Sequence, residues 1–369
     1  MTETLAEAIA LSGDLIGDAP ESWDRAGRIP VPFVRAMGTK GLLCAEVPAE
    51  FGGLGLSSLD NGELTAHVGS LCSSLRSLMT SQGMAAWTLR RLGSPSHHEA
   101  FLPRLTDGGL AAVAFSESGA GSDLSAMRTR IVPDGDSVVV DGAKVWITGA
   151  AYADLLVVFG TYGSGAAVVV VPADAPGVRI EPVPDPLGCR AAGHADIAFS
   201  SVRVPAANVL PGAGQPPALL VTAALAYGRM SVAWGCTGIL RACLSAAARH
   251  AASREQFGRP IAEHQLVARH LAELVVAEQT ATRVCEHAGR CWDSGSPEMV
   301  TAVLLAKHVS ATQAVRGASR AVQVLASAGA RDGHVVARAH RDAKLMEIIE
   351  GSSEICQLAL ARSALAVWG

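Results

Sequence analysis

The feature that most constrains this chain is the spacing of its apolar residues, which changes from helical to strand-like and back. Apolar residues recur with heptad-like spacing over residues 1–112 and again over 215–369, as in helices that bury one face. Residues 113–214 instead hold short runs rich in valine and isoleucine, as in strands. These three blocks predict an α+β protein with an N-terminal helical domain over 1–112, a middle antiparallel β-domain over 113–214 and a C-terminal four-helix bundle over 215–369.

The middle block predicts an antiparallel sheet or a small barrel. Asp141-Gly142 lies between two of its β-branched runs and predicts a hairpin turn, because this dipeptide tolerates the positive φ angles of tight β-turns. The β-branched runs cover residues 137–140, 144–147, 155–159, 167–171 and 196–199.

The C-terminal block predicts long helices that favour an antiparallel bundle. The most apolar run in the chain, residues 217–225, is too short to cross a bilayer, so we expect no membrane association. The expected helices cover residues 218–252, 260–293, 297–328 and 338–349, and a last helix follows Ser352.

Composition limits the class of protein. The 369 residues are 49% hydrophobic and 17% charged, which fits a large buried interior or an oligomer that covers further surface. The net charge of −4 argues against nucleic-acid binding. The N-terminus lacks the basic start and apolar core of a secretory signal. The eight cysteines form no Cys-x-x-Cys pair, and we expect them to be reduced, buried and inert in a cytoplasmic protein.

A glutamate near the C-terminus is a candidate for catalysis. The expected helix over 338–349 leads into Glu350, and Gly351 would end that helix while Ser352 caps the next one. A carboxylate in a last helical turn faces the negative end of the helix dipole, which raises its pKa and suits a general base for a carbon acid. An ordinary glutamate at a helix end is the alternative.

A glycine- and serine-rich stretch over residues 114–123 is a candidate cofactor loop. Its small residues let backbone amides approach a ligand closely, and Ser116 and Ser122 add hydroxyl donors. It is not a Rossmann fingerprint, because the third glycine is missing and no βαβ unit surrounds it. A plain polar loop is the alternative.

A third stretch, residues 140–149, contains Trp146 and Thr148. One interpretation is a hairpin that buries its tryptophan in the core. The other places Trp146 against an aromatic cofactor, to which Thr148 donates a hydrogen bond.

A fourth stretch, residues 254–265, contains two arginines. Phe257-Gly258 would end one long helix and Pro260 would open the next, because proline is favoured in a first helical turn. One interpretation is a connector between helices with surface charges. The other uses Arg254 and Arg259 to bind phosphate.

In this order, the stretches resemble the acyl-CoA dehydrogenase family of flavoproteins, over residues 47–362. The resemblance also includes Arg341-Asp342-Ala343-Lys344, shortly before Glu350. It implies the fold predicted above, an FAD cofactor between the β-domain and the bundle, and oxidation of an acyl thioester. In the family, a base removes the proton beside the thioester while a hydride leaves the next carbon for the flavin. Hydrogen bonds from the flavin ribityl hydroxyl and from the base's own backbone amide stabilise the enolate-like charge.

The resemblance also implies roles for particular residues. Glu350 matches the catalytic base of most branches, and the alternative base position, just before Arg229, holds Gly228. Ser122, Arg229 and Gly351 match positions at the substrate. No metal is implied. The residues that match FAD contacts, some of them to the FAD of a neighbouring subunit, are Phe115, Ser116, Gly121, Ser122, Trp146, Thr148, Arg254, Phe257, Gln265, Gln323, Ser327, Ser352 and Glu354. A homo-oligomer follows, either a dimer or a tetramer, with electron-transferring flavoprotein or oxygen as the electron acceptor.

Other positions depart from the family pattern, mainly near the acyl and CoA channel. Ala226 stands where an acidic residue is usual, and Ala192 and His194 stand where serine and threonine are usual. The whole-chain pattern is most similar to the branch that makes hydroxymalonyl or methoxymalonyl polyketide extender units on an acyl carrier protein. We therefore expect oxidation of a carrier-bound three-carbon thioester. A conventional short- or branched-chain acyl-CoA dehydrogenase, a flavin-bearing nucleic-acid-associated protein and an inactive scaffold are the alternatives.

Overall fold

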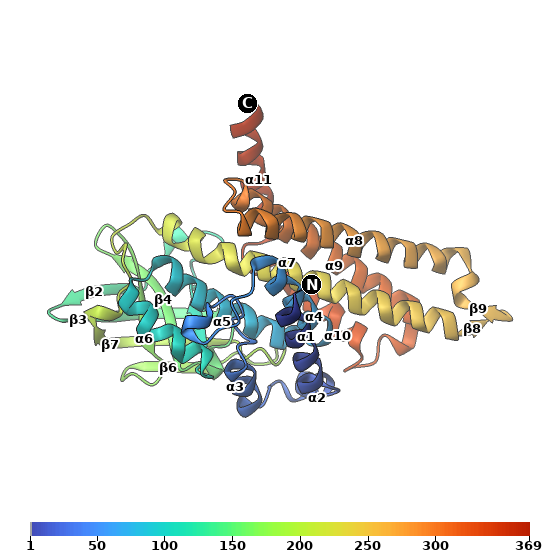
Figure 1. Ribbon diagram of the computed structural model, residues 1–369, viewed down its shortest axis with the longest axis horizontal. Helices are drawn as coiled ribbons and strands as arrows, with labels where there is room; N and C mark the ends of the chain where they lie inside the picture. The colour runs from blue at the N-terminus through green and yellow to red at the C-terminus, as the bar shows by residue number, and fades with distance from the viewer. Residues whose placement is uncertain (1) are drawn as a thin grey trace.

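The computed structural model describes residues 2–369 and places a β-sheet domain at one end of an elongated helical body (Figure 1). N-terminal helices lie beside the sheet, and the long C-terminal helices run away from it. The predicted order of helical, β and helical blocks is confirmed.

The N-terminal helices begin and end at the expected local signals. Ser57 caps α4 by accepting a hydrogen bond from the backbone N–H of Asp60, and Pro95 opens α6. Helix α5 is buried along most of its length, because it packs between α4, α7 and the first strand. The elements are α1 (Glu3–Ile16), α2 (Pro20–Ala26), α3 (Val31–Thr39), the 3-10 turn η1 (Ala49–Phe51), α4 (Ser58–Leu71), α5 (Ser73–Leu92) and α6 (Pro95–Thr106).

The middle block forms a seven-stranded sheet with the strand order β1-β4-β2-β3-β7-β6, and β5 pairs with β4. Most pairs are antiparallel, as predicted, but β4 runs parallel to β1 and to β2. Strands β4 and β5 are buried on both faces, which explains their continuous apolar runs. The strands are β1 (Ala111–Ala114), β2 (Arg130–Asp134), β3 (Ser137–Ile147), β4 (Leu155–Tyr162), β5 (Gly165–Pro172), β6 (Val178–Pro182) and β7 (Ala195–Pro205), with 3-10 turns η2 (Leu124–Ala126), η3 (Ala150–Tyr152) and η4 (Ala206–Asn208).

The hairpin predicted at Asp141-Gly142 is wrong. Strand β3 continues through this dipeptide, and its pairing with β7 shifts register there. The hairpin forms instead six residues earlier, at Gly135-Asp136 between β2 and β3, where Gly135 has φ +60°. Both sites carry an Asp-Gly pair, Asp134-Gly135 and Asp141-Gly142. The register of β3 against β7 decides which of them lies in the turn.

The C-terminal block packs α7, α8, α9 and α10 around an alanine-rich core. Alanine side chains allow close helix packing, which fits the low aromatic content of the chain. Helix α7 is long and apolar enough to span a membrane, but 72% of its most apolar window is buried inside this fold, as in a core helix. The helices are α7 (Pro217–Ser253), α8 (Gln265–Asp293), α9 (Met299–Leu325), α10 (Val335–Met346) and α11 (Ser353–Trp368), with the 3-10 turn η6 (Ala326–Ala328).

The connection between α7 and α8 differs from the expected helix junction. A two-strand hairpin, β8 (Glu255–Gln256) and β9 (Arg259–Pro260), turns at Phe257-Gly258 and leads through η5 (Ile261–Glu263) into α8. Pro260 therefore pairs in a strand and does not open a helix. Phe257 and Gly258 have φ +53° and +76°, as in a type I′ turn.

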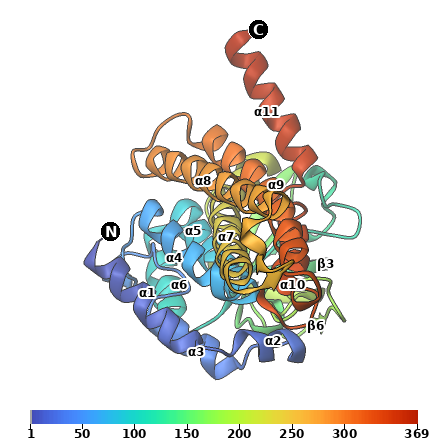
Figure 2. The same cartoon turned by 90° about the vertical axis from the view of Figure 1, so that its right-hand side faces the viewer.

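The last helix, α11, stands away from the body of the protein (Figure 2). Its only buried residue is Cys356, and large apolar side chains such as Leu365 and Trp368 are exposed. Its contacts with the rest of the chain are mainly with α9. All eight cysteines are free and buried, as expected.

Candidate active site

A cavity of about 470 Å³ opens where α5, the loop after β1, the end of β3 and the segment after α10 meet. It brings together predicted residues from three distant stretches of sequence. Its lining includes Phe115, Ser116, Gly121, Ser122, Trp146, Thr148, Glu350, Gly351 and Ser352, together with Arg76, Thr80, Ser81, His194 and Met346.

Glu350 lies in a strained turn. Helix α10 ends at Met346, and Glu350 follows four residues later with φ +57°, a left-handed conformation that is unusual for a residue other than glycine. Two cations hold this turn: the partly buried Arg229 donates from Nε to the Glu350 carbonyl at 3.0 Å, and the buried Lys307 donates from Nζ to the Gly351 carbonyl at 2.6 Å. Ser352 caps α11 as predicted.

The Glu350 carboxylate packs against α7 at Gly228. Its Oε2 atom is buried and has no hydrogen-bond partner within residues 2–369. A Cβ atom at Gly228 would lie 2.3 Å from Oε2, so only glycine leaves room for the carboxylate here. The alternative base position of the family is thus the space that Glu350 occupies.

Burial raises the pKa of Glu350, and the positive charges of Arg229, Lys307 and Arg76 partly oppose this rise. The predicted direction agrees with this result, but the predicted cause was wrong. Because α10 ends four residues earlier, Glu350 is not in a last helical turn, and removal from water replaces the helix dipole as the reason.

A buried ion pair fixes the loop that carries Ser116 and Ser122. Lys144 Nζ, on β3, donates to Glu117 Oε1 at 2.8 Å and to the Phe115 carbonyl at 2.9 Å. Glu117 also accepts hydrogen bonds from the backbone N–H groups of Arg128 and Thr129. Burial alone would raise the pKa of Glu117, but these hydrogen bonds together lower it. Burial lowers the pKa of Lys144 to about 8.

Trp146 presents an aromatic face to the cavity and is not a core residue. It is 53% exposed, and its φ of +57° shows that the backbone is strained to hold it there. Its backbone N–H donates to Asp196 Oδ1 at 2.8 Å, which anchors the strained position. The Thr148 hydroxyl lies 3.3 Å from His194 Nδ1, and the other ring nitrogen of His194 is buried without a hydrogen-bond partner among residues 2–369.

Gly121 leaves open space in the loop after β1. Its φ is not in the left-handed region, and a Cβ atom would meet nothing within 4 Å. The fold therefore gives no reason for glycine at this position. A ligand lying close to the backbone would supply one.

Six of the predicted cofactor residues do not line this cavity. Arg254, Phe257 and Gln265 are exposed at or beside the β8–β9 hairpin, and Gln323 and Ser327 are exposed at the end of α9. Phe257 is 94% exposed at the hairpin tip. Figure 1 shows this tip at the opposite end of the molecule from the sheet. Glu354 is exposed at the start of α11.

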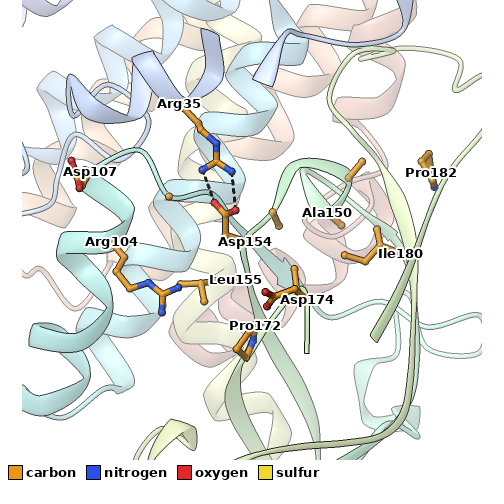
Figure 3. A pocket seen from close by; sticks show the side chains of 14 residues that line it. Arg35, Arg104, Asp107, Ala150, Asp154, Leu155, Pro172, Asp174, Ile180 and Pro182 are labelled. Carbon is orange, nitrogen blue, oxygen red and sulfur yellow. Dashed lines mark hydrogen bonds and ion pairs between the residues drawn. The ribbon is translucent and has the colours of Figure 1, made fainter. Parts of the chain in front are cut away.

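A second hollow, of about 700 Å³, is lined by none of the predicted residues (Figure 3). It lies between the N-terminal helices and the sheet. Arg35 and Asp154 form two 2.8 Å hydrogen bonds across it, and Asp154 also accepts from the backbone N–H of Leu110. This arrangement ties α3 to the residue that precedes β4.

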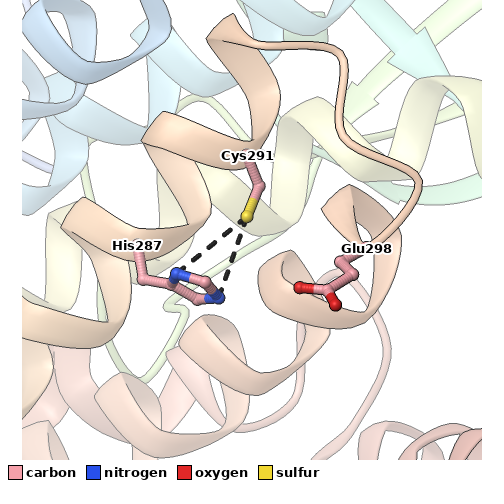
Figure 4. Close-up of side chains that lie close together, drawn as sticks. All are labelled: His287, Cys291 and Glu298. Atoms are coloured by element: carbon pink, nitrogen blue, oxygen red, sulfur yellow. Dashed lines mark hydrogen bonds between the residues drawn. The ribbon is translucent and has the colours of Figure 1, made fainter.

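One surface cluster in the part of the chain that the structure describes has the composition of a metal site. Atoms of His287, Cys291 and Glu298 lie within 4.8 Å of one another (Figure 4). His287 and Glu298 are exposed, and none of the three lines the cavity. No fourth ligand of this kind joins them among the residues that the structure describes.

Three family models cover nearly the whole chain. The N-terminal, middle and C-terminal domain models of acyl-CoA dehydrogenase match residues 8–109, 112–202 and 219–365. The chain belongs to the acyl-CoA dehydrogenase family.

Individual members of this family differ widely in similarity to the chain. A probable acyl-CoA dehydrogenase of Bacillus subtilis, YngJ, is 33% identical, and the match covers 94% of this chain and 92% of YngJ. FkbI, for biosynthesis of the methoxymalonyl extender unit of the polyketide immunosuppressant FK520, is 64% identical, with a TM-score of 0.93 over 97% of this chain and 99% of FkbI. A Mycobacterium smegmatis glutaryl-CoA dehydrogenase in complex with FADH2 shares the fold at 24% identity, with a TM-score of 0.92 over 99% and 95% of the two chains.

Sequence reasoning missed four residues around Glu350 and the cofactor loop. Lys307 and Arg76 are fully buried cations, and the Lys144–Glu117 pair is buried. A signal was present for the first two, because each lies among small and apolar residues on the buried face of a long helix, where a cation is costly. No pattern in the sequence alone pairs Lys144 with Glu117.

Proposed function

We propose that this chain is an FAD-dependent dehydrogenase that oxidises a three-carbon acyl unit held on an acyl carrier protein, in the biosynthesis of a methoxymalonyl polyketide extender unit. The observation that carries the proposal is the 64% identity to FkbI over almost the whole chain. The relative named as a probable acyl-CoA dehydrogenase is only 33% identical.

The cavity fits a flavin. Trp146 supplies an exposed aromatic face, Gly121 leaves space beside the backbone, and Thr148 carries a hydroxyl at the cavity wall. On this chain, Phe115, Ser116 and Ser122 would hold the same group. When bound, FAD supplies the acceptor for the hydride that the substrate loses.

Absorbance spectroscopy after reconstitution tests this fit without relying on activity. We expect one non-covalent FAD per chain and a yellow protein. A protein that shows no flavin bands after incubation with FAD and removal of the excess would contradict the proposal.

Glu350 is the proposed base. Its Oε2 atom has no partner in the described chain, so it is free to accept a proton, and its raised pKa makes it a stronger base than an ordinary glutamate. If the substrate carries a hydrated aldehyde at its third carbon, Glu350 takes one hydroxyl proton as that carbon loses its hydrogen as hydride and forms a new C=O bond. The product is a carboxylic acid. Arg229 and Lys307 hold the backbone of the turn and thereby fix the carboxylate.

The surroundings of the cavity support a carrier protein as the source of the thioester. Ala226 and Ala192 are buried and apolar, and His194 lines the cavity, so the polar side chains usual at these positions are missing. A carrier protein provides the same pantetheine arm as CoA without the adenine nucleotide. Docking of its own surface would replace the lost affinity.

Anaerobic bleaching of the flavin tests the substrate. We expect fast bleaching by the 2-hydroxy-3-oxo-propionyl unit on a carrier protein and slow bleaching by butyryl-CoA. The opposite result would identify a conventional short- or branched-chain acyl-CoA dehydrogenase. Rates with the same acyl unit on CoA and on the carrier protein separate the effect of the carrier from that of the acyl group.

A homo-oligomer is part of the proposal. Arg229, beside the cavity, and Arg254, beside the hairpin, lie on or next to α7 and are 25 residues apart, which is roughly 37 Å along a helix at 1.5 Å per residue. This distance exceeds the reach of one FAD molecule, so residues at both ends contact the same FAD only if they come from different subunits. Light scattering of the FAD-loaded protein should show a dimer or a tetramer, and an FAD-loaded monomer would contradict this.

The remaining partners follow from the same proposal. Eight buried free thiols fit a reducing cytoplasm. Reoxidation of the reduced protein by electron-transferring flavoprotein or by oxygen, compared directly, identifies the acceptor. The proposal includes no nucleic-acid partner, and binding to DNA that weakens steeply with salt would argue for the nucleic-acid-associated alternative.

A further inference from the structure

Arg76 is a fully buried arginine at the wall of the cavity, and it has no acidic partner. It lies on α5, where Arg76, Thr80 and Met84 follow one another at helical spacing along the cavity. None of its side chain is exposed. No carboxylate in residues 2–369 lies within salt-bridge distance, 4.0 Å, of its guanidinium.

The guanidinium is poorly satisfied. It carries five N–H donors, but it makes only two hydrogen bonds, to Thr80 Oγ1 at 3.0 Å and to the thioether of Met346 at 2.9 Å. A thioether is a weak acceptor, and the Nε atom is buried without a hydrogen-bond partner in the described part of the chain. A buried cation with unpaired N–H donors lowers the stability of the fold unless a ligand accepts hydrogen bonds from them.

The fold makes room for this side chain. A Cβ atom at Gly235 on α7 would lie 2.6 Å from Arg76 Nε, so a larger residue at Gly235 would displace the guanidinium. Thr80 is in turn bonded to Ser231 Oγ at 2.7 Å, which adds two hydroxyls on the same side. Arg76 is therefore held at a fixed position where α5, α7 and the end of α10 meet.

We infer that Arg76, with Thr80, forms a carboxylate-binding subsite at the wall of this cavity, which takes the acid group at the far end of the acyl chain. The guanidinium matches a carboxylate in shape and charge and binds it through paired hydrogen bonds. Met346, a flexible side chain at the end of α10, is the group that a carboxylate would displace. The inference rests on the proposed function in one respect, because oxidation of a three-carbon aldehyde creates a terminal carboxylate where the substrate had none.

A competing explanation makes Arg76 a distant counter-ion of Glu350. Its positive charge does lower the pKa of Glu350, although less than Arg229 and Lys307 do. Under that explanation, loss of Arg76 changes the behaviour of every thioester in the same way. Under ours, the loss affects only thioesters that carry a terminal carboxylate.

The test compares two pantetheine thioesters on the FAD-loaded protein, malonyl-pantetheine and its methyl ester, which differ in the terminal charge. Binding is read from the perturbation of the flavin absorbance, so turnover is not required. For Arg76→Met we expect malonyl-pantetheine to bind about 10- to 100-fold more weakly, the scale of a charged hydrogen bond, while binding of the methyl ester is unchanged. The affinity of Arg76→Lys for malonyl-pantetheine should lie between those of the wild type and Arg76→Met. Arg104→Gln, in the separate hollow, is the control for net charge.

Two results would overturn the subsite. Unchanged malonyl binding would do so, and so would equal weakening of both thioesters together with a shift of the pH profile, which would support the counter-ion explanation. If Arg76→Met loses FAD because it does not fold, the comparison of Arg76→Lys with wild type decides. The probe carries neither carrier protein nor CoA, so failure of the carrier proposal leaves this result intact, and failure of the subsite leaves the carrier proposal intact.

Discussion

The two ends of helix α7 differ in how far the surrounding side chains cover them. Near Gly228, side chains from α7 and α9 surround Glu350, and Arg229 and Lys307 donate to the backbone carbonyls of Glu350 and Gly351. Near Arg254, the β8–β9 hairpin holds Phe257 in a left-handed conformation at 94% exposure, and its ring meets that of His264 edge-on, with the ring centres 5.8 Å apart.

This difference indicates which part of the protein is enclosed by its own chain and which part needs a contact from outside it. A strained and exposed aromatic residue costs free energy in the isolated chain and is retained where it contacts something else. The cavity end has the features of a chemical site, and the hairpin end has those of a contact surface. Substitutions at the cavity end should therefore slow the reaction, and substitutions at the hairpin end should weaken cofactor retention.

The largest effect is expected at Glu350. Glu350→Gln keeps the size of the side chain and removes its basicity, so reduction of the flavin by substrate should slow by about 10²-fold or more, while the FAD spectrum is unchanged. Stopped-flow absorbance under anaerobic conditions measures the rate. Glu347→Gln, three residues earlier and outside the cavity, is the control. A near-normal rate in Glu350→Gln would mean that another group is the base.

The pH dependence of this step should reflect the burial of Glu350. Only the deprotonated carboxylate accepts a proton, so the rate should fall as pH drops through the pKa, by about tenfold per pH unit below it. Because burial raises this pKa, the fall should begin at a higher pH than for an exposed glutamate. The fall in rate at low pH should be absent in Glu350→Gln. A limb at the position of an ordinary glutamate would show that the carboxylate is solvated in the working protein.

A smaller effect should come from filling the space beside the base. In Gly228→Ala, the new methyl group would lie 2.3 Å from the present position of Oε2, so the carboxylate must move. We expect the rate of flavin reduction to fall by roughly 10- to 100-fold, as a misplacement of about 1 Å can cost 10²-fold. Gly13→Ala in α1, where the nearest atom lies 3.4 Å away, is the matched helical control. An unchanged rate would show that the turn is flexible.

At the hairpin end the effect should appear in cofactor retention. Arg254→Ala should weaken FAD binding by about 10-fold, the scale of one charged hydrogen bond, and should leave the rate of the FAD-saturated protein near normal. FAD release during dilution and gel filtration measures the loss. Arg249→Ala, also exposed on α7, controls for removal of a positive charge. Equal FAD retention in both variants would remove Arg254 from the FAD site.

The smallest effect on the fold is expected at Phe257. Because its side chain contacts almost nothing in its own chain, Phe257→Ala should change the free energy of unfolding of the isolated chain by about 0.5 kcal/mol or less. Phe159→Ala, at a fully buried position of β4, should cost about 3–5 kcal/mol. Denaturant titration compares the two. A large loss at Phe257 in a monomeric sample would show that the tip supports its own chain.

Much of the architecture was predictable because the signals are local. Apolar periodicity gave the order of the three blocks, and the serine at 352 marked the start of the last helix. The choice between two Asp-Gly pairs was not predictable in this way. Each pair permits a tight turn, and pairing with the distant strand β7 decided that Gly135-Asp136 turns while Asp141-Gly142 continues the strand.

The sequence by itself determined that Ser352 caps the helix that follows Glu350, and that small and aromatic residues cluster in two cofactor-like stretches, because these depend on neighbours in the chain. Only the tertiary structure decided that Gly228 makes room for Glu350, that Arg229 reaches its carbonyl across 121 positions, and that Arg76 is buried without an acid. Such pairings depend on how helices pack, and local preferences carry no information about contacts between segments so far apart.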